Sequence, residues 1–274
     1  MPNLHVMTGA GEVPAMPVIR KIGFSDLKDA LVSGVNDFLS APTQLIFLAI
    51  IYPIVGLFLA RLTFGSHVLP LLFPLVAGYA LIGPFAAVGL YEISRRREQG
   101  YEVSWTDAFG VLRCPSLDAI GAVGFVLMIV FVIWLMTALT LYDALFEGDP
   151  PASIGQFLTQ IFTTTKGWVL IILGHAFGAL FAIVAFTIGV VSFPLLVDRD
   201  VGAVVALQTS VRAVAENPVT MAAWGLLVGV LLAIGSLPFF IGLAVVLPVL
   251  AHATWHLYRK VVEPVEPAAP PVSG

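Results

Sequence analysis

Residues 118–142 read DAIGAVGFVLMIVFVIWLMTALTLY, and after Asp118 this stretch contains no Asp, Glu, Lys or Arg. A helix of this length rises about 37 Å at 1.5 Å per residue. That is enough to cross a hydrocarbon core of roughly 30 Å. The basic Arg113 precedes the stretch and the acidic Asp143 follows it. The sequence therefore predicts a membrane-spanning helix here.

The composition of the whole chain also indicates a membrane protein. Of 274 residues, 59% are hydrophobic and 11% are charged, whereas soluble domains carry roughly 25% charged residues. So few charges cannot cover a water-facing surface, and the apolar residues fall in long runs rather than in short alternating patterns. The first forty residues contain no apolar run of the signal-peptide type, so we expect the spans themselves to drive insertion.

Further apolar runs bring the predicted number of spans to six. In residues 43–91, the single charged residue is Arg61. Residues 219–258 contain none, and a single helix of that length would reach about 60 Å. The chain must therefore fold back, and Gly235-Ser236-Leu237-Pro238 offers a turn. The predicted spans are 43–62, 68–91, 118–142, 167–197, 219–235 and 238–258.

The Lys and Arg residues predict the orientation of these spans. With six spans, eleven basic residues fall on the side that holds both chain ends, and two fall on the other side. Loops rich in Lys and Arg stay in the cytoplasm, so we expect both termini to be cytoplasmic. The two exceptions are Arg61 and Lys166. The eleven are Arg20, Lys21, Lys28, Arg95, Arg96, Arg97, Arg113, Arg199, Arg212, Arg259 and Lys260.

A similar pattern occurs three times on the cytoplasmic side: a short amphipathic stretch, a proline and a span. The stretches begin near Phe24, Trp105 and Val204, and Pro42, Pro115 and Pro218 follow them. Proline suits the first turn of a helix because its missing N–H would have no partner there. The pattern predicts short cytoplasmic amphipathic helices, with three helix-plus-hairpin repeats as one interpretation and chance similarity as the other.

Three motifs at span ends resemble a family of predicted bacterial integral membrane proteins, known as domain of unknown function 2189. They begin at Pro84 (PFAAVGLYEISRRRE), Ser192 (SFPLLVDRD) and Ala215 (AENP). The resemblance covers roughly residues 20–260 and implies a location in a bacterial inner membrane. It implies no activity, so no functional residue is carried over from it.

The predicted fold is therefore an all-α membrane protein with one membrane domain at residues 24–260. We expect residues 1–23 to be disordered. We also expect a disordered tail at 261–274, because it is rich in proline.

Three histidines are the polar residues within the predicted spans that could hold a cofactor. They are His175, His252 and His256, and imidazole is a common ligand for haem and metals. Counted from the outer ends of their spans, His175 lies about 12 Å deep and His252 about 21 Å deep. Two axial ligands should reach one iron at similar depth, so they are weak haem candidates. We expect structural histidines and neither a cofactor nor a metal.

The sequence favours a non-enzymatic function. The predicted spans contain no charged residue near mid-membrane, which disfavours a proton pump or ion-coupled antiporter, and no phosphate loop or zinc motif is present. We expect no catalytic residue and an accessory or scaffolding role. The expected partners are the lipid bilayer, other membrane proteins or a second copy, and not nucleic acid. The alternatives are a permease or channel for a neutral or amphiphilic solute and, in third place, an enzyme, a class that includes a haem redox protein.

The predicted topology can be tested with tags at the N-terminus and after Lys260. Both tags should resist protease added to cells whose outer membrane has been opened, because both should face the cytoplasm. Immunoblotting measures the survival of each tag, and a tag placed after Lys166 should be cleaved as the positive control. Cleavage of either terminal tag would contradict the orientation.

Overall fold

The computed structural model describes residues 16–40, 70, 74, 87–148, 151–237 and 242–264. Apart from an isolated bridge between Ile19 and Val262, the regular structure of these residues is helical, which confirms the all-α class. The elements are α2 (Phe24–Ser40), α5 (Val88–Glu98), the 3-10 helix η2 (Trp105–Arg113), α6 (Leu117–Phe146), α7 (Ile154–Thr163), α8 (Thr165–Asp198), α9 (Ala203–Glu216), α10 (Pro218–Ser236) and α11 (Leu243–Val261).

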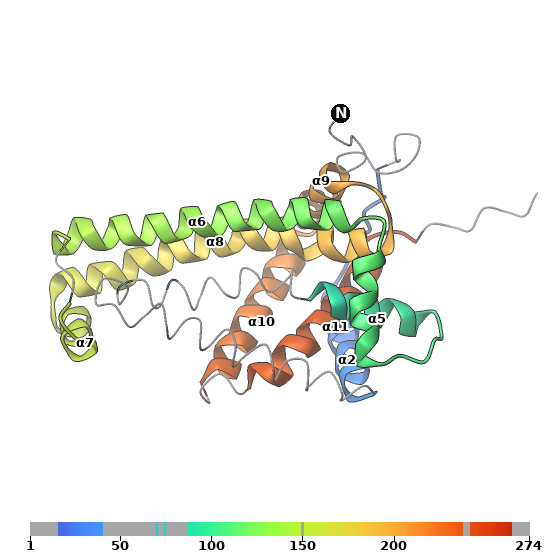
Figure 1. Ribbon diagram of the computed structural model, residues 1–274, viewed down its shortest axis with the longest axis horizontal. Coiled ribbons are helices and arrows are strands. Elements are labelled where there is room, and N and C mark those ends of the chain that lie inside the picture. The colour runs from blue at the N-terminus through green and yellow to red at the C-terminus, as the bar shows by residue number, and fades with distance from the viewer. Residues whose placement is uncertain are drawn as a thin grey trace, which may run out of the picture.

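The two longest helices, α6 and α8, lie side by side along the long axis of the molecule (Figure 1). They have 30 and 34 residues and rise about 45 and 51 Å, so each is longer than a bilayer core. Trp134 of α6 packs between them, with its ring on Phe181 and against Gly178 of α8. Its indole N–H donates to the carbonyl of Pro74 at 3.0 Å, which satisfies the polar atom of a buried ring.

Three described helices are long and apolar enough to cross a membrane: α6, α8 and α10. They correspond to the predicted spans 118–142, 167–197 and 219–235, which are confirmed as apolar helices of spanning length. The first predicted span (43–62) lies outside the described residues, as does the second (68–91) except for Pro70, Pro74 and residues 87–91. Most of 1–23 and the tail beyond residue 264 also lie outside them.

The sixth predicted span (238–258) is described only from residue 242 onward, and its full length stays a prediction. The helix α11 runs from Leu243 to Val261, but it is not among the three candidates for crossing a membrane. The physical reason is its second half, where His252, His256, Arg259 and Lys260 follow the apolar first half within one helix. The described part of this span therefore combines an apolar first half with a polar second half.

The connection between α6 and α8 contains a helix that the sequence analysis missed. Residues 154–163 form the amphipathic helix α7, which contacts α8 and lies at the far end of the long helix pair (Figure 1). The hydroxyl of Ser153 accepts a hydrogen bond from the backbone N–H of Gln156 at 3.2 Å. Serine in this position is a common N-terminal helix cap, and it was the sequence signal for this helix.

The predicted amphipathic stretches form α2, η2 and α9. At η2, Asp107 accepts a hydrogen bond from the backbone N–H of Ser104 at 2.7 Å, as expected for a capping pair. Each element packs against another helix: η2 on α5, α9 on α8 and α2 on α11. The first amphipathic helix thus pairs with the last helix of the chain.

The two ends of the described chain are joined by hydrogen bonds. The backbone N–H of Arg20 donates to the carbonyl of Val261 at 2.7 Å, and that of Glu263 donates to Val18 at 3.0 Å. Asn217, just before α10, adds a second connection, because its side chain accepts from the N–H of Ile22 at 2.9 Å and donates to the carbonyl of Arg20 at 3.1 Å. The segment before α2 is therefore held against the ends of α9 and α11.

The helices α2 and α11 approach closely at one glycine. A Cβ atom on Gly34 would lie 2.5 Å from the backbone nitrogen of Ala253 and 2.7 Å from its Cα. Those atoms belong to the backbone of a buried helix and cannot move aside independently. The contact therefore requires glycine at position 34, and it sets the distance between the two helices.

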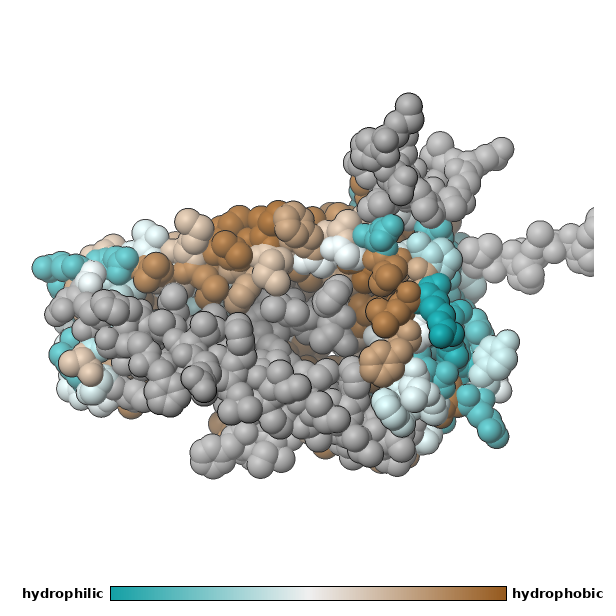
Figure 2. Space-filling view, viewed as in Figure 1, coloured by the Kyte–Doolittle hydropathy of each residue, from teal (hydrophilic) through white to brown (hydrophobic). Residues whose placement is uncertain are grey.

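The face of the molecule drawn in Figure 2 is apolar along α6 and α8 and polar at its two ends. In Figure 2 a hydrophobic band runs along the long helix pair and hydrophilic residues lie at both ends. The band includes Phe125 and Met136 of α6 and Ile172, Leu180 and Ile183 of α8, each more than half exposed. An exposed apolar band of this extent fits contact with lipid or with other membrane proteins.

Replacement of Gly34 should separate α2 from α11. We expect Gly34→Ala to lower the free energy of unfolding by about 1–3 kcal/mol, since added methyl groups in a tight contact force the backbone to shift. Thermal unfolding in mild detergent, followed by tryptophan fluorescence, measures the effect, because Trp255 is buried on α11. The control is Gly121→Ala on α6, where a Cβ would meet no atom within 4 Å. Equal midpoints for the two variants would contradict the close contact.

Candidate functional site

The elements α2, α5, η2, α9 and the second half of α11 lie at one end of the molecule (Figure 1), and hydrophilic residues gather there (Figure 2). We call this region the charged layer. It holds two features that are candidates for function: a buried network around Asp37 and a cavity lined with arginine side chains. Its principal side chains are Asp37, Glu92, Ser94, Arg95, Arg96, Arg97, Arg113, Asp198, Arg199, His252, His256 and Arg259.

The Asp37 network joins α2, α5 and α11. Asp37 Oδ2 lies 2.8 Å from Ser94 Oγ and 2.9 Å from His256 Nε2. Ser94 Oγ also lies 2.6 Å from His252 Nδ1. An ionised carboxylate can only accept hydrogen bonds, and a hydroxyl can donate only one. Ser94 therefore donates its hydrogen bond to Asp37 and accepts one from the Nδ1–H of His252. The contacts thus assign the tautomer of that ring.

The charge of Asp37 is balanced within the network. Arg97 Nε lies 3.3 Å from Asp37 Oδ1, and the same guanidinium donates to Ser40 Oγ at 2.7 Å. Burial opposes ionisation of Asp37, but hydrogen bonds from His256 and Ser94 outweigh burial and hold its pKa below the ordinary value for aspartate. Asp37 is therefore a carboxylate at neutral pH, although its residue is only 7% exposed.

Serine, histidine and aspartate occur together here, but not in the arrangement of a hydrolase. In a catalytic triad the carboxylate orients the histidine through the ring nitrogen that does not face the serine. Here the carboxylate contacts Ser94 and His256 directly and lies 4.0 Å from His252 Nδ1, the nitrogen that faces Ser94. Ser94 is 1% exposed and His252 is 0% exposed, so a substrate has no access to this hydroxyl. The network connects three helices rather than presenting a nucleophile.

Glu92 is the second buried carboxylate of the charged layer. Arg95 binds it through two nitrogens, at 2.7 and 2.9 Å, and Arg96 Nε lies 2.7 Å from Oε1. Arg96 also reaches Asp107 of η2 at 2.8 Å, which ties η2 to α5. Burial raises the pKa of Glu92, but hydrogen bonds from the two arginines outweigh burial and the net shift is downward.

Asp198, the last residue of α8, interacts with two side chains of α11. Its carboxylate accepts a hydrogen bond from the Tyr258 hydroxyl at 2.5 Å and contacts Arg259 at 3.3 Å. Arg199 contacts the same carboxylate at 3.2 Å and donates to the carbonyl of Glu263 at 2.6 Å. These bonds hold the end of α8 against the end of the described chain.

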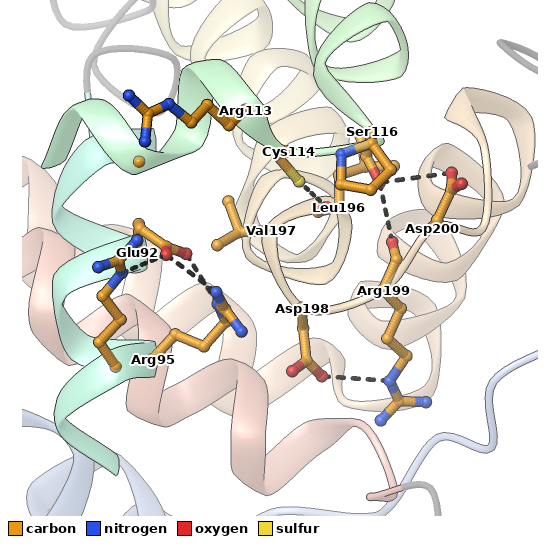
Figure 3. Close-up of a pocket in the computed structure, with 13 residues that line it drawn as sticks. Glu92, Arg95, Arg113, Cys114, Ser116, Leu196, Val197, Asp198, Arg199 and Asp200 are labelled. Atoms are coloured by element: carbon orange, nitrogen blue, oxygen red, sulfur yellow. Dashed lines mark hydrogen bonds and ion pairs between the residues drawn. The ribbon is translucent and has the colours of Figure 1, made fainter. Parts of the chain in front are cut away.

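A cavity of about 360 Å³ lies between Glu92 and Asp198. Figure 3 shows Glu92, Arg95 and Arg113 on one side and Asp198, Arg199 and Asp200 on the other. The thiol of Cys114 also lines it, with Sγ 3.8 Å from the carbonyl of Leu196. The volume is within the range of small-molecule sites, roughly 300–1,000 Å³.

The structure brings two of the three candidate histidines together. His252 and His256 both belong to the Asp37 network. His175 lies on the exposed side of α8, 2.7 Å from the carbonyl of Ile171 through Nδ1. It is separated by about 35 Å of helix from Asp198, the α8 residue that contacts α11. Among the described residues, no group of three or more His, Cys, Asp or Glu side chains has the arrangement of a metal site.

The sequence analysis missed the roles of Asp37 and Ser94. One available signal was the position of Asp37, three residues after Gly34 and one before Phe38, on the apolar side of an amphipathic stretch. A charge on the side that becomes buried indicates a partner elsewhere in the chain. The motif containing Ser94 was quoted for its resemblance alone, and no pattern identified its hydroxyl as a partner of Asp37.

The helical fold, the spanning candidates and the charged layer together define a helical integral membrane protein. Residues 71–198 match the family model described as "Predicted integral membrane protein (DUF2189)". The predicted family is thereby confirmed over this segment, and its description states no activity. No curated protein matches the chain, and no solved structure does.

The Asp37 network should contribute to stability only while its carboxylate is charged. Because the folded-state pKa of Asp37 is lowered, its contribution is present above the unfolded pKa of about 4 and is lost as pH falls further. At pH 7, Asp37→Asn should reduce the free energy of unfolding by about 1.5–3 kcal/mol, the usual contribution of hydrogen bonds to a charged group.

Thermal unfolding between pH 3 and pH 7 tests this dependence. The difference between the wild type and Asp37→Asn should be largest at neutral pH and should shrink below about pH 4. The matched control is Asp29→Asn on the same helix, because the Asp29 side chain is 63% exposed. A constant difference across the pH range would contradict the role assigned to the Asp37 charge.

Proposed function

We propose that this chain is an accessory or scaffolding protein of a bacterial inner membrane, with six spans and both ends in the cytoplasm. In this role it packs against other membrane proteins, or a second copy, through the apolar band along α6 and α8. The observation that carries the proposal is this band of exposed apolar residues on α6 and α8. Such a surface is suited to packing against lipid or another membrane protein.

The polar side chains of the described spans support a packing role over a transport role. Thr137 in α6 donates to the carbonyl of Ile133 at 2.8 Å, and Ser236 in α10 donates to Leu232 at 2.7 Å. These groups bond within their own helices and so do not line a polar path. An intramembrane transport route needs polar groups directed into a shared cavity.

Two observations support the proposed topology. The segments 18–22 and 259–263 are hydrogen-bonded to one another, which supports an even number of crossings with both ends on one side. Eleven of the thirteen Lys and Arg residues fall on that side in the six-span arrangement, which favours the cytoplasm.

The pairing of the amphipathic elements supports three repeated units. Each of α2, η2 and α9 packs against another helix, and α2 pairs with α11, the last described helix. A ring of three similar units would produce this closure. The repeat gives the charged layer a common plan, with one amphipathic element and one helix end from each unit.

The alternative function is a permease for a neutral or amphiphilic solute. One observation favours it: Pro194 lies inside α8 four residues before its end, and the following residues line the cavity. Proline removes a backbone hydrogen bond within a helix, and interrupted helices form the binding sites of many transporters. The cavity, however, lies in the charged layer and not along the apolar band.

Site-specific photo-crosslinking in native membranes tests the packing role. A photoreactive residue at Phe125 or Met136, which are 66% and 64% exposed, should give protein adducts of discrete mass. The matched control is Val123 on the same helix, which is 0% exposed and should give no intermolecular adduct. Native mass measurement in mild detergent should show a complex of the same mass. A monomer without protein adducts that moves solute across liposomes would contradict the proposal and favour the permease.

A further inference from the structure

The cavity in the charged layer carries more positive than negative side chains. Four arginines line it, together with three carboxylates, Glu92, Asp198 and Asp200. Arg95 and Arg96 bind Glu92, and Arg199 and Arg259 bind Asp198. Two of the three carboxylates are therefore already neutralised by guanidinium groups, which leaves little capacity for binding a cation.

Arg113 differs from the other arginines of the cavity. It is exposed at the end of η2, and among the described residues no carboxylate forms an ion pair with it. Arginine side chains bind carboxylates and phosphates well, because the planar guanidinium presents several donors in a fixed arrangement. The cavity therefore offers the guanidinium of Arg113, which has no carboxylate partner among the described residues, next to the other arginines that line it.

The cavity lies at the boundary between the apolar helices and water. The spanning candidate α6 begins at Leu117, and the spanning candidate α8 ends at Asp198, on either side of the cavity. The adjacent η2 exposes Trp105, Phe109 and Leu112, a composition typical of helices that lie in the headgroup layer. Phosphate groups of lipids occupy this same depth.

We propose that this cavity binds an anionic phosphate group, with Arg113 as its principal ligand and Arg95 and Arg199 as secondary contacts. The group is a phosphate ester, supplied either by an anionic phospholipid headgroup or by a soluble phosphate compound. This inference does not depend on partner binding through α6 and α8, because the two surfaces use different residues.

The experiment uses the full chain purified in mild detergent. Thermal unfolding and native mass measurement are carried out with phosphatidylglycerol, with phosphatidylcholine, and with inorganic phosphate against an equal concentration of chloride. The wild type should bind phosphatidylglycerol, inorganic phosphate or both more tightly than their controls. Arg113→Gln should weaken that binding about fivefold, the usual effect of one basic side chain at an anionic surface.

The matched control is Arg212→Gln on α9, which removes an equal charge from an exposed arginine paired with Glu216 outside the cavity. It should bind like the wild type. Preference for phosphatidylglycerol without a response to inorganic phosphate supports a lipid headgroup, and a response to inorganic phosphate without lipid preference supports a soluble phosphate compound. Equal binding by Arg113→Gln and the wild type, or no preference for either anion, would overturn the proposal.

The two proposals can fail separately. Loss of protein crosslinks at Phe125 with retained phosphate binding would reject the packing role alone. Retained crosslinks with no anion preference would reject the phosphate site alone.

Discussion

The contact between α2 and α11 is the constraint on which the charged layer depends. A glycine at position 34 lets the two backbones meet at Ala253, and one helical turn later this proximity places Asp37 beside His256. The strand-like pairing of residues 18–20 with 261–263 reinforces the contact. Since α2 and α11 are the first and last helices described, their contact closes the chain into a ring. The remaining elements of the layer then assemble within that closure.

The second constraint is the cost of transferring charge out of water. A chain that is 59% hydrophobic has few places for charged groups, and the described structure collects them at the ends of its apolar helices. There, carboxylates that become buried are matched by arginines: Asp37 by Arg97, and Glu92 by Arg95 and Arg96. Removing one member of such a buried pair leaves an uncompensated charge, which costs more than the pair contributes. The charged layer is therefore cooperative, and Arg113 stands out because it has no such internal match among the described residues.

These two constraints separate two possible roles within one molecule. The apolar band along α6 and α8 is suited to contact with lipid or another membrane protein, whereas the arginine-lined cavity is suited to an anion at the membrane surface. The family description, a predicted integral membrane protein, agrees with the first property and is silent on the second. The geometry of the Asp37 network, with its buried serine and histidine, fits a structural connection between helices and does not present a reactive group.

The sequence by itself determined that the chain is a helical membrane protein, and it located three helices of spanning length and the three amphipathic elements. It could do so because the length of an apolar run, its hydropathy and the spacing of its apolar residues are local properties of a chain. It also indicated the start of α10 through Pro218. Only the tertiary structure decided that Asp37, Ser94, His252 and His256 share hydrogen bonds and that Arg113 borders a cavity. These contacts join residues up to 219 positions apart, and no local pattern encodes which helix ends meet when the chain closes.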